Sequence, residues 1–391
     1  MQSNRRAPSL RLLDYYLIEG VSSFAATIFL LSLFFWTRAR FDFSNTENLL
    51  LGVVQGAAHM VAARLGGRWS DRWGYTRIIL AGLAGTCAVS ALGWLPEHRA
   101  TPFVVITAYA ALLGLTWPAL EGGAMHMPGR INMPRRLGLY NLVWSFCGAI
   151  GFFLSGFVFA WRVDAIFWIP AGLHALQVAW ILFQRGRHAI EGEAAMQFPH
   201  MGDRQPVAVK RRLMRLALLS NSVGYFLAGG FSALTPHLGE RLGLTPSWAI
   251  WLGSSLLAAR AAGFVILYRW HGWHYHAGWS AYALWSAPVW LAVIFFTTEV
   301  WLAAGACLLL GFSLGLSYYM SIYYALDAGD NKGEQGGLHE MIIGIGILAG
   351  PLAGAAGGHV FGSTLGAKAT IVILALLITA IGQTALNRIN R

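Results

Sequence analysis

The sequence predicts an all-α integral membrane protein with twelve transmembrane helices, arranged as two pseudo-symmetric six-helix bundles. Three observations support this fold class: the composition, the regular recurrence of apolar segments, and an internal repeat. Of the 391 residues, 56% are hydrophobic and 12% are charged, and the mean hydropathy is +0.54. Soluble domains carry about 25% charged residues, so this chain has too little polar surface to coat a water-soluble globule.

Twelve apolar segments follow one another, each close to the roughly 20 residues that a helix needs to cross the hydrocarbon core of a bilayer. The first is too long for the apolar region of a signal peptide and lacks a small-residue cleavage site, so we expect it to remain as a membrane helix. The expected spans are 12–36, 46–66, 77–95, 102–122, 138–160, 165–183, 214–236, 247–268, 277–297, 300–323, 339–360 and 366–386.

One long polar stretch interrupts this series and predicts the boundary between the halves. We expect an N-terminal six-helix bundle over 1–183, a cytoplasmic linker over 184–213 and a C-terminal six-helix bundle over 214–391. The three cysteines all fall in apolar segments and read as small buried hydrophobes, and we expect neither a metal site nor a cofactor.

The positive charges predict the orientation. Cytoplasmic loops of membrane proteins carry an excess of Lys and Arg, and most basic residues here lie on the side that holds both termini and the linker. The opposite side would carry Arg38, Arg40, Arg99, Arg162, Arg241 and Lys368. We therefore expect a multi-pass protein of the cytoplasmic (inner or plasma) membrane with both termini in the cytoplasm.

The net charge of +11 is spread thinly along the chain, unlike the clustered charge of a nucleic-acid-binding stripe. The expected partners are therefore the lipid bilayer, a small-molecule substrate and a coupling ion. The expected state is a monomer.

The two halves share short matches at a nearly constant offset, which indicates duplication. Residues 62–67, Ala-Ala-Arg-Leu-Gly-Gly, reappear as Ala-Ala-Arg-Ala-Ala-Gly at 258–263. Leu112-Leu113-Gly114 recurs as Leu309-Leu310-Gly311, and Gly138, Gly151 and Ser155 match Gly337, Gly350 and Gly354. Six plus six helices related in this way is a known transporter architecture.

A loop motif follows the second span: Gly67-Arg68-Trp69-Ser70-Asp71-Arg72-Trp73-Gly74-Tyr75-Thr76-Arg77. It resembles the signature of the major facilitator superfamily, Gly-x-x-x-Asp-Arg-x-Gly followed by basic residues, in the cytoplasmic turn where that family places it. The resemblance implies a gate on the inward face built from Gly67, Asp71, Arg72, Gly74 and Arg77. Independently of the name, Gly67 and Gly74 permit close backbone approach and a tight turn. Asp71 is an anion placed to meet a helix N-terminus or an arginine.

The sequence departs from the family pattern in ways that bear on coupling. Tyr75-Thr76 stands where a basic pair is usual, and span 102–122 lacks the arginine that proton-coupled members often carry. Gly350-Pro351 is similar to the Gly-Pro motif of family antiporters, although that motif belongs in the fifth span. The alternative interpretation of these small residues is helix packing.

Ionisable residues inside spans are costly and mark functional sites. Glu19 is the leading candidate for proton coupling, because it shares a polar and small-residue face with Tyr16 and Ser23 in a helix that lines the cavity in the resembled family. The alternative is a structural salt bridge between helices. Glu121 shares a stripe with Trp117 and would lie either in the cavity or at the headgroup level.

Further polar residues complete the predicted site. Asn221 and Tyr225 form a cavity-facing pair, Tyr318 is the repeat counterpart of Glu121, and His339 with Glu340 would serve the cytoplasmic gate of the second half. Arg64 and Arg260 are repeat-related and expected to snorkel to the headgroups. His59 and His174 are expected to be packing residues.

The sequence thus predicts a secondary active transporter that works by alternating access and is not an enzyme. We expect proton coupling, with export by antiport of neutral, amphipathic or cationic compounds favoured. The alternatives are uptake of a sugar-like metabolite and a non-transporting sensor with the same fold.

Overall fold

The computed structural model describes residues 10–95, 98–127, 133–187, 205–328 and 332–389. These residues form twelve α-helices, each long and apolar enough to cross a membrane. The helices are α1 (Leu12–Phe41), α2 (Asn45–Trp73), α3 (Tyr75–Leu92), α4 (Thr101–His126), α5 (Met133–Trp161), α6 (Ala165–Arg187), α7 (Val207–Arg241), α8 (Pro246–Arg269), α9 (Ala277–Phe296), α10 (Val300–Ala328), α11 (Lys332–Val360) and α12 (Thr364–Ile389).

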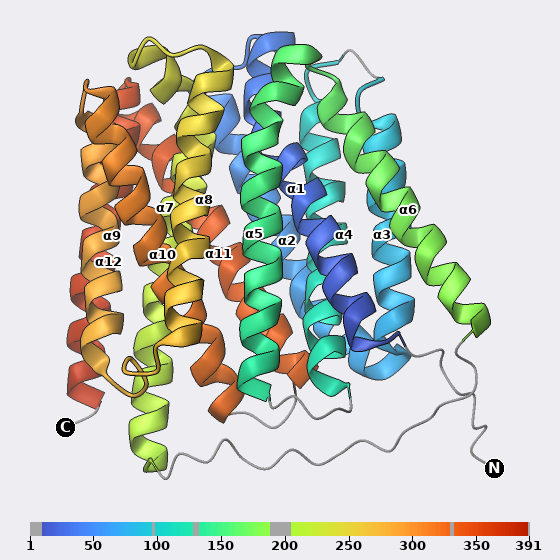
Figure 1. Cartoon of the computed structure of the whole chain (residues 1–391). Coiled ribbons are helices and arrows are strands. Elements are labelled where there is room, and N and C mark those ends of the chain that lie inside the picture. The colour runs from blue at the N-terminus through green and yellow to red at the C-terminus, as the bar shows by residue number, and fades with distance from the viewer. Residues whose placement is uncertain (1–9, 96–97, 128–132, 188–204, 329–331, 390–391) are drawn as a thin grey trace.

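The helices gather into two groups that stand side by side, α1–α6 in blue to green and α7–α12 in yellow to red (Figure 1). Helix α1 begins and helix α12 ends at the same, lower end of the molecule (Figure 1). This end is called the terminal end below, and the opposite one the outer end. The predicted all-helical fold with twelve membrane-spanning segments is confirmed.

Most helices extend past the expected spans, because apolarity marks only the part in lipid. Helix α6 continues to Arg187 and helix α7 begins at Val207, so both ends of the predicted linker 184–213 are helical. Residues 188–204 of that linker lie outside the described residues. Local signals set several helix ends: Ser44 caps α2 by accepting a hydrogen bond from the Glu47 backbone N–H, and Thr245 caps α8 in the same way.

Repeat-related glycines make equivalent close approaches in the two halves. A Cβ atom on Gly114 of α4 would lie 2.9 Å from the His59 carbonyl oxygen of α2. Its repeat partner Gly311 of α10 lies even closer to α8, because a Cβ atom there would overlap the Leu256 carbonyl oxygen. Likewise Gly151 of α5 packs on the backbone of Phe24 in α1, and Gly350 of α11 on the backbone of Phe226 in α7. The matched sequence fragments therefore occupy matched positions in the two bundles.

The halves meet along two helix pairs, α2 with α11 and α5 with α8, and the second pair is seen side by side in Figure 1. Near the terminal end, a Cβ on Gly337 of α11 would lie 3.0 Å from the Ala63 carbonyl oxygen of α2, and Gly138 of α5 packs against the Tyr268 ring of α8. Contacts therefore join the bundles between the cavity described below and the terminal end.

Toward the outer end, polar contacts also join the halves. Arg38, at the end of α1, forms an ion pair with Glu240 of α7 at 2.5 Å. The Asn45 side-chain amide donates a hydrogen bond of 2.9 Å to the Thr364 hydroxyl of α12. The space between the bundles is thus bounded by inter-half contacts at both ends.

Candidate functional site: a cavity between the halves

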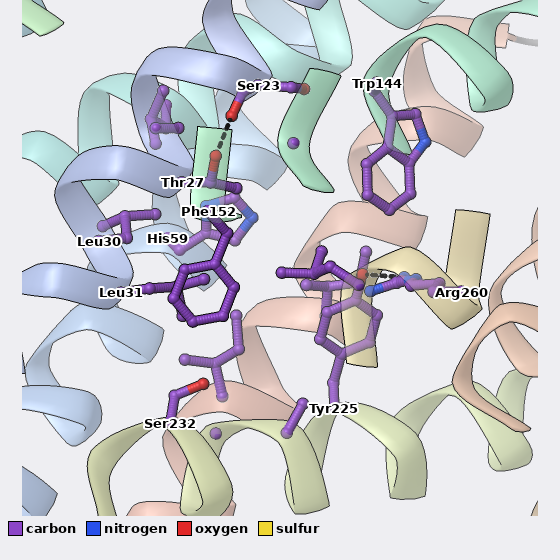
Figure 2. Close-up of a pocket in the computed structure, with 18 of the residues that line it drawn as sticks. Ser23, Thr27, Leu30, Leu31, His59, Trp144, Phe152, Tyr225, Ser232 and Arg260 are labelled. Atoms are coloured by element: carbon purple, nitrogen blue, oxygen red, sulfur yellow. Dashed lines mark hydrogen bonds between the residues drawn. The ribbon is translucent and has the colours of Figure 1, made fainter. Parts of the chain in front are cut away.

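A cavity of about 230 Å³ lies between the two bundles. It is larger than the roughly 150 Å³ apolar cavity that accommodates benzene in an engineered protein, so a small organic molecule fits. Helices of both halves line it, and most of the wall is apolar, including Leu31 of α1 and Phe152 of α5 (Figure 2). The ionisable residues of the wall are Glu19, His59, Glu121, Arg260 and Glu340.

Glu19 is buried in the cavity wall, and both of its carboxylate oxygens accept hydrogen bonds from hydroxyl groups. Ser23, one turn along α1, donates to Oε1 at 2.7 Å, and Tyr140 of α5 donates to Oε2 at 2.7 Å. Neither partner is a cation, so Glu19 does not form the alternative salt bridge between helices with any described residue. The carboxyl group can therefore gain or lose a proton without breaking an ion pair.

Two further glutamates line the cavity. Glu121 of α4 is 4% exposed, and its Oε1 atom has no hydrogen-bond partner among the described residues. The other oxygen, Oε2, faces Gly336 of α11, where a Cβ atom would lie only 3.0 Å away. Glu121 was predicted to lie either in the cavity or at the headgroup level, and in the structure it lines the cavity.

Glu340 of α11 forms a pair with His59 of α2, at 3.1 Å between Oε2 and Nε2. Both side chains are buried, and both line the cavity. Glu340 was predicted to serve the cytoplasmic gate and His59 to be a packing residue, and the structure adds that the two form a pair in the cavity wall. Sequence reasoning missed the pair because its members are 281 positions apart. The neighbouring His339 is buried and interacts with the hydroxyl of Ser321 at 2.9 Å.

Arg260 of α8 lies on the wall opposite His59 (Figure 2). It is 6% exposed and donates a hydrogen bond of 2.6 Å to the Tyr225 hydroxyl. Its guanidinium carbon lies 4.8 Å from the ring centroids of both Trp144 and Tyr318, and the rings of Tyr225 and Phe264 stand 5.2 and 5.9 Å away. The snorkelling prediction is wrong, because these rings hold the cation inside. Desolvated contacts of this kind are worth about 2 kcal/mol or more each.

Two residues predicted to contact substrate do not line the cavity. Tyr16 lies one turn nearer the terminal end than Glu19, and its hydroxyl donates to the Arg136 carbonyl oxygen at 3.2 Å. Asn221 lies one turn from Tyr225 and is buried against His339, with 3.4 Å between Nδ2 and Nε2. In both cases a partner on a neighbouring helix takes up the polar group. Of the other predicted residues, the cavity wall includes Ser23, Trp117, Tyr225 and Tyr318.

The sequence model of the Major Facilitator Superfamily matches residues 15–351 of the chain. This chain belongs to the Major Facilitator Superfamily. No curated protein matches it.

Solved transporters of the superfamily share its fold over nearly the whole chain. The crystal structure of the nucleoside transporter NupG has a TM-score of 0.70 at 10% identity and covers 95% of this chain and 98% of its own. A variant of NupG gives 0.70 at 11% identity, covering 96% and 99%. The human organic anion transporter MFSD10 (TETRAN) gives 0.67 at 15% identity, covering 95% and 98%. At these identities the likeness concerns the fold alone, and the superfamily membership supports transport rather than catalysis.

The superfamily loop motif lies at the terminal end, with its two glycines in different roles. Gly67 is inside α2, where a Cβ on Gly337 of α11 would lie 3.1 Å from its Cα atom, and Gly74 forms the turn to α3 with φ of 94°. The expected tight turn is therefore made by Gly74, while Gly67 provides close approach to the other half. Asp71 accepts a hydrogen bond of 2.6 Å from the Tyr75 hydroxyl, and no described arginine pairs with it. The remaining motif residues Arg72 and Arg77 are exposed.

The Gly-Pro sequence of α11 serves packing. A Cβ atom on Gly52 of α2 would lie 2.8 Å from Pro351 Cγ, and one on Gly229 of α7 would lie 3.0 Å from Pro351 Cδ. Pro351 thus fits between two small residues of neighbouring helices. The interpretation of these residues as helix-packing positions accounts for them without an antiporter motif.

Proposed function

We propose that this chain is a secondary active transporter that moves a small organic solute across the cytoplasmic membrane by alternating access. Its N-terminal bundle (1–183) and C-terminal bundle (214–391) would rock around the cavity, with both termini in the cytoplasm. The observation that carries the proposal is a cavity between the halves, bounded by inter-half contacts at both ends. In a transporter of this kind, the two sets of contacts would break alternately.

Proton coupling is supported by the balance of charges around the cavity. Three carboxyl groups line it, while the ionisable bases of the described wall are Arg260 and His59. Charges buried in a medium of low polarity must be compensated. Protons that bind the carboxyl groups would supply that compensation, and we propose Glu19 as the coupling residue, because both of its partners are hydroxyls.

The solute would contact Glu19, Ser23, Trp117, Glu121, Tyr225 and Tyr318, which all line the cavity. The wall combines a large apolar area with carboxyl groups, which favours a neutral, amphipathic or cationic compound over a dianion. Export against inward-moving protons is the direction we propose. The turn at Gly74 with Asp71, and the pair His339 and Glu340, would change their contacts as the terminal end opens.

A flux assay tests the proposal. The purified protein is reconstituted into liposomes, an inward-directed pH gradient is imposed, and the movement of labelled cationic, neutral, zwitterionic and anionic solutes is compared with protein-free liposomes. The proposal predicts gradient-dependent movement of at least one class by the protein. Uptake of a sugar with no response to pH would favour the rival of metabolite import, and no flux in any class would favour a non-transporting sensor.

A further inference from the structure

The cavity wall includes one arginine, Arg260, and three acidic residues, Glu19, Glu121 and Glu340. Arg260 lies across the cavity from His59 (Figure 2). Both the arginine and one of the acids have a polar atom without a hydrogen-bond partner among the described residues. These atoms limit which solute can satisfy both groups at once.

The guanidinium group of Arg260 lacks an anion among the described residues. Its hydrogen bond goes to the neutral Tyr225 hydroxyl, its Nε atom has no partner, and no described carboxylate lies within ion-pair distance of it. Four aromatic rings fix the orientation of the group without neutralising its charge. A planar guanidinium that is held rigidly and is still free to bind an anion is suited to a carboxylate.

Among the acidic residues of the wall, Glu121 has an unsatisfied acceptor. Its Oε1 atom is buried without a hydrogen-bond partner in the described part of the chain, and the next acid in the wall, Glu19, has only hydroxyl partners. A buried acceptor left without a donor is destabilising. An ammonium or other N–H group of a solute would supply the donor.

The rest of the wall is largely apolar. Leu30, Leu31 and Phe152 line the cavity on the side of His59 (Figure 2). An apolar body of the solute would displace water there. A single guanidinium also matches one negative charge, which favours a carboxylate over a doubly charged phosphate.

We propose that the cavity binds a zwitterionic solute with an apolar body, whose carboxylate contacts Arg260 and whose ammonium group faces Glu121 and Glu19. This inference rests on the proposed function for the location of the solute site and makes Arg260 a specificity-determining residue. Tyr225 acts through Arg260 as a positioning residue, since its hydroxyl accepts the 2.6 Å hydrogen bond from the guanidinium group.

Four probes that share a phenyl ring and an ethyl chain test the charge requirement: phenylalanine, 3-phenylpropanoate, phenethylamine and 2-phenylethanol. Each is added at the same concentration to the purified full-length protein in detergent, and the shift of the unfolding temperature is measured. We expect phenylalanine to give the largest shift, and the compounds that lack the carboxylate or the ammonium to give smaller ones. An equal or larger shift with 3-phenylpropanoate, phenethylamine or 2-phenylethanol, or no shift with any probe, would overturn the inference.

Variants locate the effect. Arg260→Gln should abolish the shift caused by phenylalanine, and Tyr225→Phe, which keeps the ring, should weaken the affinity roughly tenfold. The matched control is Arg64→Gln, the repeat counterpart in α2, which lies outside the cavity wall and should leave the shift unchanged. A phenylalanine shift that survives Arg260→Gln would also overturn the inference.

Transport assays on the same samples separate this inference from the proposed function. Binding of phenylalanine that depends on Arg260, without flux in liposomes, would contradict the proposed function and leave the inference intact. Gradient-driven flux of a cation that is unaffected by Arg260→Gln would support transport and contradict the inference.

Discussion

His59 of the first half and Glu340 of the second form a hydrogen-bonded pair, 3.1 Å apart, inside the cavity wall. Next to this pair the two helices are in close contact: Gly56 of α2 lies against the backbone of Leu348, and Gly344 of α11 against the backbone of Met60. Because the pair spans the boundary between the halves, any movement that separates α2 from α11 at this level must break it. The pair therefore links the charge state of the cavity to the contact between the bundles.

Replacing Glu340 with Ala should destabilise the protein, because it leaves His59 buried without its partner. We expect a loss of about 1–3 kcal/mol, measured as a fall in the unfolding temperature in detergent. The matched control is Glu240→Ala, which breaks the other described ion pair between the halves at the exposed outer end. Exposed pairs contribute about 0–1 kcal/mol. Equal effects of the two substitutions would contradict a special role for the buried pair.

Gly56→Ala should impair both folding and transport. An added Cβ would overlap the Leu348 backbone, which has no flexible end to move aside, so α2 and α11 would have to separate. The control is Gly172→Ala in α6, where a Cβ meets nothing within 4 Å. Membrane expression and the unfolding temperature measure the difference, and similar values for the two variants would mean that α2 and α11 do not pack this closely.

Gly74→Ala should reduce transport more than it reduces stability, if the superfamily motif forms a gate. The φ of 94° at Gly74 is one that an alanine rarely adopts, and Gly243 at the outer end, with φ of 68°, offers a control for strain alone. Gly243→Ala should lose roughly 1–2 kcal/mol of stability, and Gly74→Ala, with ψ of 137° outside the left-handed helical region, roughly 1–3 kcal/mol. Only Gly74→Ala should slow flux in liposomes by more than this loss explains. Equal flux in the two variants would assign Gly74 a structural role only.

Much of the fold could be predicted because lipid imposes simple rules on sequence. Apolar length located all twelve helices, and the repeat between Gly114 and Gly311 corresponds to equivalent helix crossings in the two halves. Helix ends were less accurate: Val207 already belongs to α7, because a helix continues beyond the bilayer where hydropathy gives no signal.

The site could be predicted only in part. Glu19 stood out because a carboxylate is rare inside a span. Arg260 was wrongly expected at the headgroups because the rings of Trp144 and Tyr318 that surround it come from other helices. The partner of His59, Glu340, also comes from another helix. No local sequence pattern predicts contacts between side chains on different helices. The repeat suggested equivalent positions for Arg64 and Arg260, but Arg64 lies outside the cavity wall.

The most direct test of the central claim, that a solute crosses through this cavity in exchange for protons, is to replace Glu19 with Gln. The amide keeps the shape of the side chain but cannot exchange a proton with the cavity. Glu299→Gln, on an exposed residue outside the cavity wall, is the control. The measurement is the rate of solute movement driven by a pH gradient in proteoliposomes. We predict that Glu19→Gln abolishes the gradient-driven component while Glu299→Gln retains it. A Glu19→Gln protein that responds to the gradient as the unaltered protein does would contradict the account.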